Sequence, residues 1–381
     1  MKKLILGAIF LRLLVMPFLF HPDIKVYSFQ ASHLKQGVWN IYEREEFVYQ
    51  PLTYLFLGSY QTLIQSLARG LNNWLADSSG GAITNPSLYW YLILLKLPIL
   101  IFDLLVGFLL YKLMGKKALT LWLFNPLTIV LLYVFSNVDI FPLFFVLLSC
   151  LFYKKDKNLL SAIALGVGAG FKMYPLLLLP FFLISQKDWR RMIIYLAGAL
   201  GTFFLILMPF MGPAMLQSSL VSGLSTRIFQ GQISLGFGES LYPAVIGLVV
   251  IYLLAYLKKD IPMENWIVIL LLTLFSFIHF HIQWLMWGAP FVLMVWLKNE
   301  KIKPLLLVAI LLAFSIPLMY NDKFMGASLF TPISSLFSLI PTPFAVVQKV
   351  FDPYVIQGVL HSALVGITIM LGYKLLKDEQ H

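Results

Sequence analysis

One acidic residue stands where the first apolar stretch of the chain gives way to a polar segment. Asp23 follows His21 and Pro22, directly after the apolar run 4–20. Proline suits the first turn of a helix, so Asp23 should lie near a helix N-terminus, where the helix dipole favours the ionised carboxylate. Such a carboxylate can serve as a general base, or it can simply cap a helix at a membrane boundary. This segment alone leaves both interpretations open.

Three other breaks between apolar runs also carry polar side chains. Each has a simpler explanation, since a carboxylate or amide can start a helix, a lysine can extend to the membrane interface, and histidines are common at that interface. Four such turns at one membrane depth would nevertheless form a polar cavity, so we expect them to converge. The residues at these three breaks are Asn137, Asp139, Lys172, Tyr174, His279, His281 and Gln283.

The elements that must position these residues are membrane helices. An apolar helix needs about 20 residues to cross about 30 Å of hydrocarbon, and shorter ones can tilt or pair. The sequence therefore predicts an all-α integral membrane protein with about twelve transmembrane helices and an amphipathic first outer loop. The predicted segments are 4–20, 88–111, 118–135, 139–153, 158–172, 174–186, 190–210, 241–257, 263–279, 283–297, 304–320 and 355–374.

The orientation follows from lysine and arginine, which favour short cytoplasmic loops. Most of the 28 basic residues fall on short connections that share one side if the N-terminus is inside. Both termini are then cytoplasmic, and 21–87, 212–240 and 321–354 are the outer segments. We expect a multi-pass protein of a prokaryotic plasma membrane, with its polar site on the non-cytoplasmic face.

Composition excludes several classes of protein. A chain with 60% hydrophobic and 12% charged residues is not a soluble domain. Contact of the inner loops with anionic membrane lipids accounts for the net charge of +11, so we expect no nucleic-acid partner. The single cysteine, Cys150, excludes an intramolecular disulfide. His279 and His281 lack an evident third ligand, and we expect neither a metal nor a cofactor.

The outer segments contain further candidates. Helical spacing of apolar residues over 21–37 predicts an amphipathic helix on the outer leaflet. The apolar run up to Leu67 should be a re-entrant or surface helix. Segment 212–240 carries Arg227 and Glu239 among glycines, as either a mobile lid or a simple connector; these glycines are Gly212, Gly223, Gly231, Gly236 and Gly238.

Three charged residues lie deep within predicted spans, away from the span ends. Arg12 and Asp103 should sit at the same depth, and an unpaired charge there is costly, so we expect them to pair between the first two spans. Lys96 should lie further outward and add positive potential to the outer site.

The order of the motifs resembles a known family. After Asp23 come Ile41-Tyr42-Glu43, Tyr49-x-Pro51-Leu52, Phe124-Asn125-Pro126-Leu127, Asn137-x-Asp139, Lys172-x-Tyr174-Pro175 and Gln283-Trp284. This pattern resembles the polytopic C-type (GT-C) glycosyltransferases, most closely the catalytic subunit of GPI mannosyltransferase I and its prokaryotic relatives. The resemblance covers most of 1–297, the expected glycosyltransferase core, and 298–381 adds C-terminal transmembrane helices of the same domain.

The resemblance implies inverting transfer of a hexose, commonly mannose, from a polyprenyl-phosphate carrier to a lipid or glycan acceptor. The D-x-D motif of that family corresponds to Asp23-Ile24-Lys25, where a lysine replaces the second acid. Asp23 would be the catalytic base, and cations would stabilise the departing phosphate. The expected substrate-binding residues are His21, Lys25, Tyr49, Gln50, Asn137, Asp139, Lys172, Tyr174, Arg227, Glu239, His279, His281 and Gln283.

A multispan transporter or a flippase of a lipid-linked saccharide is the alternative. Such proteins place ionisable groups near the middle of the membrane at broken helices and show two matching halves. Here the large loop follows the first span and the halves do not match, which favours the enzyme.

Overall fold

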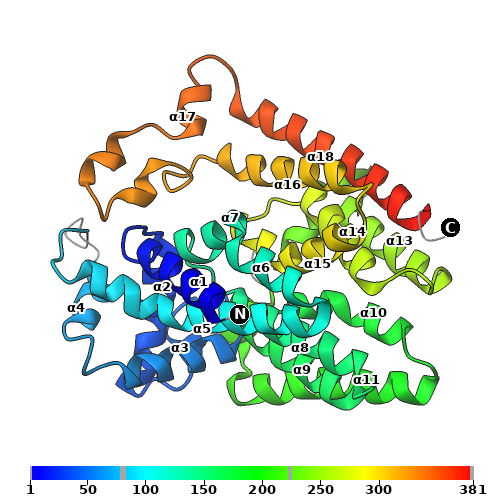
Figure 1. Cartoon of the computed structure of the whole chain (residues 1–381), viewed down its shortest axis with the longest axis horizontal. Helices are drawn as coiled ribbons and strands as arrows, with labels where there is room; N and C mark the ends of the chain where they lie inside the picture. The colour runs from blue at the N-terminus through cyan, green and yellow to red at the C-terminus, as the bar shows by residue number, and fades with distance from the viewer. Residues whose placement is uncertain (1, 78–82, 222–224, 378–381) are drawn as a thin grey trace.

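The structure is a computed structural model that describes residues 2–77, 83–221 and 225–377. Within these ranges the chain is mostly helical, with one small antiparallel sheet, so the all-α prediction is confirmed (Figure 1). The candidate glycine Gly223 falls outside the described residues.

The N-terminal part begins with a helix that leads into a layer of short helices. Helix α2 packs against both α3 and α4, so its apolar side faces protein. Ile24, Tyr27 and Ala31 on that side are buried, which matches the predicted helical spacing. The helices of this part are α1 (Lys2–Val15), α2 (Pro22–Ser32), α3 (Pro51–Leu63) and α4 (Leu71–Ala76).

The middle of the chain forms a helical bundle. Helix α9 packs closely on both α8 and α11, and a Cβ added at Gly166 would lie 2.4 Å from the Ala199 carbonyl oxygen. Small residues permit such close approach of helices. The helices of this part are α5 (Leu88–Met114), α6 (Lys116–Phe124), α7 (Pro126–Ile129), α8 (Ile140–Lys154), α9 (Asn158–Phe171), α10 (Leu179–Ile184) and α11 (Trp189–Leu207).

The C-terminal part contains the hairpin and the remaining long helices. Helix α18 packs on α14 and α16, and α15 packs on α14 and α6, so this part is joined to the bundle. The elements are α12 (Pro213–Met215), β1 (Ile233–Gly236), β2 (Glu239–Leu241), α13 (Pro243–Leu257), α14 (Met263–Phe277), α15 (Leu285–Lys298), α16 (Lys303–Leu318), α17 (Pro343–Val347) and α18 (Pro353–Lys377).

The number of membrane spans is not confirmed. Each predicted span contains a helix, but among the described residues only Leu88–Met114, Trp189–Phe210 and Pro353–Lys377 are long and apolar enough to cross a membrane. The pair Lys116–Phe124 and Pro126–Val134 would add a fourth, with a bend of 53°. The Asn125 side chain accepts a hydrogen bond from Leu127 N and caps the second helix of this pair, and Pro126 lies in its first turn. These two residues cause the break between the helices.

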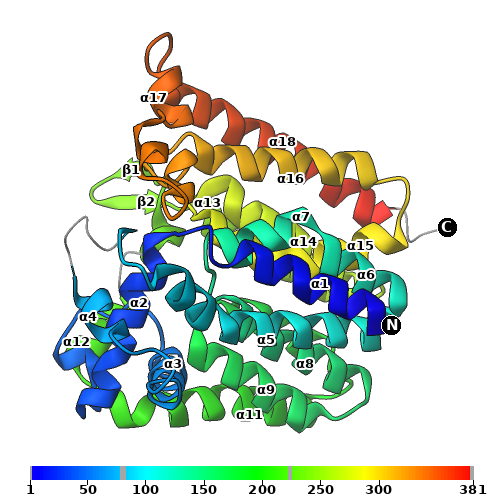
Figure 2. The ribbon, with the colours of Figure 1, turned by 60° about the vertical axis from the view of Figure 1, so that its left-hand side comes forward.

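The two ends of the molecule differ in character. Figure 2 shows both marked termini on one side and α2, α4, α12, the hairpin and α17 on the opposite side. The three segments predicted to be outer therefore gather at one end of the helices. We call it the loop end.

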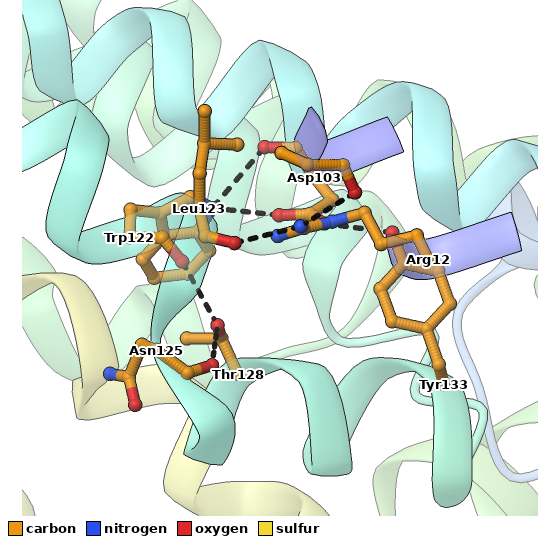
Figure 3. A network of polar contacts seen from close by, with 8 residues as sticks. Arg12, Asp103, Trp122, Leu123, Asn125, Thr128 and Tyr133 are labelled. Atoms are coloured by element: carbon orange, nitrogen blue, oxygen red, sulfur yellow. Dashed lines mark hydrogen bonds and ion pairs between the residues drawn. The ribbon is translucent and has the colours of Figure 1, made fainter. Parts of the chain in front are cut away.

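The predicted pairing of Arg12 with Asp103 is confirmed. Arg12 Nε donates to Asp103 Oδ2 at 2.5 Å, and both side chains are fully buried. Figure 3 shows the network around them, in which Trp122 and Tyr133 also donate to Asp103. Arg12 donates further to the Leu123 carbonyl oxygen at 2.8 Å. Charge-assisted hydrogen bonds thus join α1 to α5 and α6.

Lys96 lies near enough to the loop end to act on it, as predicted, since its positive charge helps to lower the pKa of His21. Its ammonium donates to the carbonyl oxygens of Met16, Leu19 and Tyr133 at 2.6–2.9 Å. The carbonyls of Met16 and Leu19 follow the end of α1, and that of Tyr133 lies in the segment after α7. Helix ends leave carbonyl oxygens without partners inside the helix. Lys96 therefore stabilises the backbone that leads into the loop end.

Candidate active site

The start of α2 fixes the position of Asp23. His21 precedes the helix, and its Nδ1 accepts a hydrogen bond from the Asp23 backbone nitrogen at 3.3 Å. Pro22 occupies the first turn, as predicted. The Tyr27 hydroxyl donates to the Ser136 carbonyl oxygen at 2.9 Å, which holds α2 against the turn before α8. The part of α2 that carries Asp23 is thus held by two hydrogen bonds, one to His21 and one from Tyr27 to Ser136.

Three of the four predicted turns meet at Asp23. Gln283 Nε2 donates to Asp23 Oδ2 at 2.7 Å and to the Phe135 carbonyl oxygen at 3.2 Å. Asn137 Nδ2 in turn donates to the Gln283 carbonyl oxygen at 2.7 Å, and its Oδ1 accepts from the Asp139 backbone nitrogen at 2.8 Å. One continuous chain of hydrogen bonds therefore links Asp23 to the turn that precedes α8.

The second oxygen of Asp23 is held only loosely. It lies 3.5 Å from His21 Nδ1, and the Asp23 side chain is 41% exposed. Burial lowers the pKa of His21, and the positive charge of Lys96 acts in the same direction. A neutral imidazole forms no ion pair, so one carboxylate oxygen of Asp23 remains accessible for proton transfer.

The fourth turn is joined through an ion pair. Lys172 Nζ lies 2.7 Å from Asp139 Oδ1, with Asp139 only 1% exposed. Trp287 Nε1 donates to the other oxygen of Asp139 at 2.6 Å. Lys172 also lies 5.4–5.8 Å from the ring centres of Tyr49, Trp284 and Trp287, within cation–π range. Its charge is thus placed between a buried carboxylate and aromatic faces.

Aromatic rings form a stack beside this pair. The rings of Tyr174 and Trp287 are parallel with centres 4.4 Å apart, and Trp287 stacks on Trp284 at 4.7 Å. Tyr49 adds a further ring next to Lys172. Burial raises the pKa of Tyr49, and the negative charges of Asp23 and Asp139 raise it further, so Tyr49 lies within electrostatic range of both carboxylates.

A second cationic group also lies close to the Trp284 ring. Arg227 lies 5.3 Å from that ring and donates to the His279 carbonyl oxygen at 3.0 Å. Its NH2 is 3.1 Å from His281 Nε2. Desolvation lowers the pKa of His281, and Arg227 lowers it further. His281 is therefore the neutral acceptor of a hydrogen bond from Arg227.

A pocket of about 270 Å³ opens between these groups. Gln50, Lys172, Tyr174, Trp284 and Trp287 line it together with aliphatic side chains. Ile228, the neighbour of Arg227 in the chain, is also part of the wall. The pocket thus extends from the Lys172 ion pair toward the glycine-rich segment that carries Arg227.

Two predicted residues lie apart from this cluster. Lys25 faces α4, where its ammonium donates to the Asp77 carbonyl oxygen and lies 5.2 Å from the Trp74 ring centre. Glu239 is exposed on β2 of the hairpin. Helix geometry explains the position of Lys25. Residues two apart in sequence point to different faces of a helix, so the Lys25 side chain lies on another face of α2 than Asp23.

Sequence reasoning missed three contributors. Trp287 holds Asp139, Tyr320 packs its ring 4.3 Å from that of His279, and Gln230 Oε1 accepts from the His279 backbone nitrogen at 3.1 Å. Trp287 could have been found, since it follows the noted Trp284 by three residues on one helical face. Tyr320 and Gln230 carried no such signal.

Comparison with known protein families gives a match over the middle of the chain. Residues 47–234 match the family model of glycosyltransferase family 87. The matched range is just under half of the chain and contains Tyr49, Asp139, Lys172 and Arg227. Asp23 and the turn at 279–283 lie outside it. A search of curated proteins found no match.

The family 87 match indicates glycosyltransferase activity. It agrees with the predicted C-type glycosyltransferase class, whereas the finer likeness to GPI mannosyltransferase I is not confirmed. The apolar helices identify a membrane protein.

Proposed function

We propose that this protein transfers a hexose, of which mannose is the first candidate, from a polyprenyl-phosphate carrier to a lipid or glycan acceptor on the non-cytoplasmic face of the membrane. The observation that carries the proposal is the placement of Asp23. Its carboxylate is positioned by Gln283 and partly open to solvent, in one cluster with Lys172 and Arg227 beside an aromatic pocket.

The proposed reaction is a single inverting displacement. Asp23 takes the proton of an acceptor hydroxyl while that oxygen attacks the anomeric carbon of the donor. The bond from the anomeric carbon to the phosphate oxygen breaks, and the electron pair leaves with the polyprenyl phosphate. The acceptor then carries the sugar with inverted configuration at the anomeric carbon.

The departing phosphate needs positive charge. Arg227 has a planar guanidinium with donors suited to phosphate oxygens and lies 5.3 Å from the ring centre of Trp284. Lys172 adds positive charge from the pocket side, although Asp139 partly neutralises it. Lys25 drops out of this role because it faces α4.

Reconstitution with a defined donor tests the proposal. The purified protein in proteoliposomes would receive a radiolabelled polyprenyl-phosphate mannose or glucose, together with a membrane glycolipid extract as acceptor. We expect loss of the donor, appearance of free polyprenyl phosphate and label in a new product with inverted anomeric configuration. Movement of an intact donor between leaflets without cleavage would contradict the proposal and indicate a flippase.

The lipid bound after purification gives a second measurement. Mass spectrometry of lipids extracted from the purified protein should find a polyprenyl phosphate or its hexosyl ester above the level in the surrounding membrane. Enrichment of nucleotide sugars instead would contradict the proposed donor class.

A further inference from the structure

Three buried polar atoms in the pocket wall have no partner within the described part of the chain. They are Oε1 of Gln50, the hydroxyl of Tyr174 and Oγ of Ser219. Gln50 is 2% exposed and Tyr174 is 4% exposed. Buried polar groups are almost always hydrogen-bonded in folded proteins, because leaving water without a new partner is costly. Three such groups lining one cavity therefore point to a ligand that supplies the missing hydrogen bonds.

The remaining lining restricts what that ligand can be. Leu176, Leu177, Leu274 and Ile278 provide aliphatic walls, and the tryptophans provide aromatic ones. A ligand that fits must present carbon–hydrogen surface to these walls and hydroxyl groups at separate points. A pyranose ring has this character, since its faces carry C–H bonds and its edge carries hydroxyls. An isoprenoid chain has no group for Gln50 or Tyr174.

We propose that this pocket is the subsite for the hexose of the donor, and that Gln50 and Tyr174 bind its hydroxyl groups. Gln50 Oε1 accepts a hydrogen bond from one sugar hydroxyl, and the Tyr174 hydroxyl exchanges one with another. The inference rests on the proposed function and adds to it the residues that select the sugar.

The pocket also orients the donor. Ile228 lines it beside Arg227, which stands over Trp284, and Gln283, the residue before Trp284, holds Asp23. A sugar in the pocket would direct its phosphate toward Arg227 and its anomeric carbon toward the Asp23 side. Asp23, with the attacking hydroxyl, and the leaving phosphate would then lie on opposite sides of the anomeric carbon, as inversion requires.

The test compares binding with stability. Removing the unpartnered hydroxyl of Tyr174 breaks no hydrogen bond in the free protein, so Tyr174→Phe should keep or raise the melting temperature. Gln50→Met also removes the hydrogen bond that Gln50 Nε2 donates to the Ser219 carbonyl oxygen at 3.4 Å, so this variant is compared by binding alone. Both should weaken binding of a synthetic farnesyl-phosphate mannose or glucose by roughly tenfold, the effect of one hydrogen bond. Quenching of tryptophan fluorescence gives the dissociation constants. Farnesyl phosphate without sugar should bind the variants and the wild type equally.

Tyr195→Phe is the matched control. The Tyr195 hydroxyl is buried in the bundle, 2.9 Å from Ser161 Oγ and 3.1 Å from Ser149 Oγ. This substitution should lower the melting temperature and leave binding of the hexosyl probes unchanged. Tyr174→Phe should weaken binding without lowering the melting temperature, and Tyr195→Phe should do the reverse. This difference separates a ligand-binding hydroxyl from a structural one.

Three outcomes would overturn the subsite. Unchanged affinity of both variants for the hexosyl probes would remove Gln50 and Tyr174 from sugar recognition, while transfer by the wild type would leave the proposed function standing. An equal loss of affinity for sugar-free farnesyl phosphate would assign the pocket to the phosphate or the chain. A wild type that binds neither hexosyl probe would remove the subsite and the proposed function together.

Discussion

Two carboxylates of the loop end differ in what surrounds them. Asp139 is 1% exposed, and its oxygens are taken by Lys172 and Trp287. Asp23 is 41% exposed and keeps one oxygen without a close donor. A general base needs a free lone pair, whereas a buried and fully bonded carboxylate holds elements together. In the proposed reaction, this contrast favours Asp23 over Asp139 as the general base.

Gln283 should act as the positioning residue for Asp23. Gln283→Leu keeps the size of the side chain but removes both hydrogen bonds, to Asp23 and to Phe135. Since a misplacement of about 1 Å can cost about 100-fold in rate, we expect the kcat of hexosyl transfer to fall by ten- to a hundredfold with little change in the KM for the donor. Steady-state kinetics measure both. An unchanged kcat would show that Asp23 does not depend on Gln283.

The pH response of His281 should depend on Arg227. Desolvation and Arg227 lower the pKa of His281, so its neutral form persists below pH 6.5. Between pH 6.5 and about 4, the unfolded chain therefore binds more protons at His281 than the folded chain does. The stability that neutral His281 contributes above pH 6.5 is lost as the pH falls through this range. Arg227→Gln should raise this pKa, and Arg227→Lys should keep it low.

NMR titration of protein with isotope-labelled histidine measures the pKa of His281 in these variants, with His281→Gln to assign the signal. Identical titration of His281 in the wild type and in Arg227→Gln would contradict the electrostatic coupling.

At the scale of elements, the contact between α2 and α3 determines where Asp23 lies. A Cβ added at Gly58 of α3 would come within 2.7 Å of the Ala31 carbonyl oxygen and of Leu34 Cβ. Gly58→Ala should therefore push α2 away, reduce the melting temperature and lower hexosyl transfer by about tenfold or more. Thermal unfolding and the transfer assay measure the two effects.

Gly201→Ala is the control for that substitution. Gly201 lies within α11, and an added Cβ there would meet nothing within 4 Å. Alanine favours a helix over glycine by roughly 0.5–1 kcal/mol, so this variant should be neutral or slightly more stable. Equal behaviour of the two variants would show that α2 is not packed tightly against α3.

The sequence predicted some elements well for identifiable reasons. The start of α2 followed from Pro22 and Asp23, and the pairing of Arg12 with Asp103 followed from their equal depth and the high cost of an unpaired charge. The count of spans did not follow, because proline and capping residues divide apolar runs into short helices. Run length alone cannot show where a helix breaks.

The sequence predicted most residues of the candidate site but not all of the contacts between them. The sequence indicated which turns were polar, and three of them meet at Asp23. It could not show that Lys25 leaves α2 on another face, that Trp287 binds Asp139 or that the Tyr174 hydroxyl lacks a hydrogen-bond partner among the described residues. Those facts depend on side-chain directions set by tertiary packing.

At the scale of the whole molecule, the gathering of the three predicted outer segments at the loop end predicts one membrane face for all of them. Single cysteines replacing the exposed residues Glu46, Gln232 and Ser335 in a Cys150→Ala background should react with a membrane-impermeant maleimide in intact cells. A cysteine at exposed Lys155 should react only after the membrane is opened. Reversed labelling would place the site on the cytoplasmic face, and labelling from both sides would separate the three segments.

In the proposed reaction, Asp23 removes a proton from the acceptor during sugar transfer. Asp23→Asn keeps the shape and the hydrogen bond to Gln283 but removes the basic group. Compared with the wild type and with Glu46→Gln, an exposed acid of the same outer segment, transfer from polyprenyl-phosphate hexose should fall by about 10²–10⁴-fold in Asp23→Asn at unchanged melting temperature. Transfer by Asp23→Asn at the rate of the wild type would contradict the account.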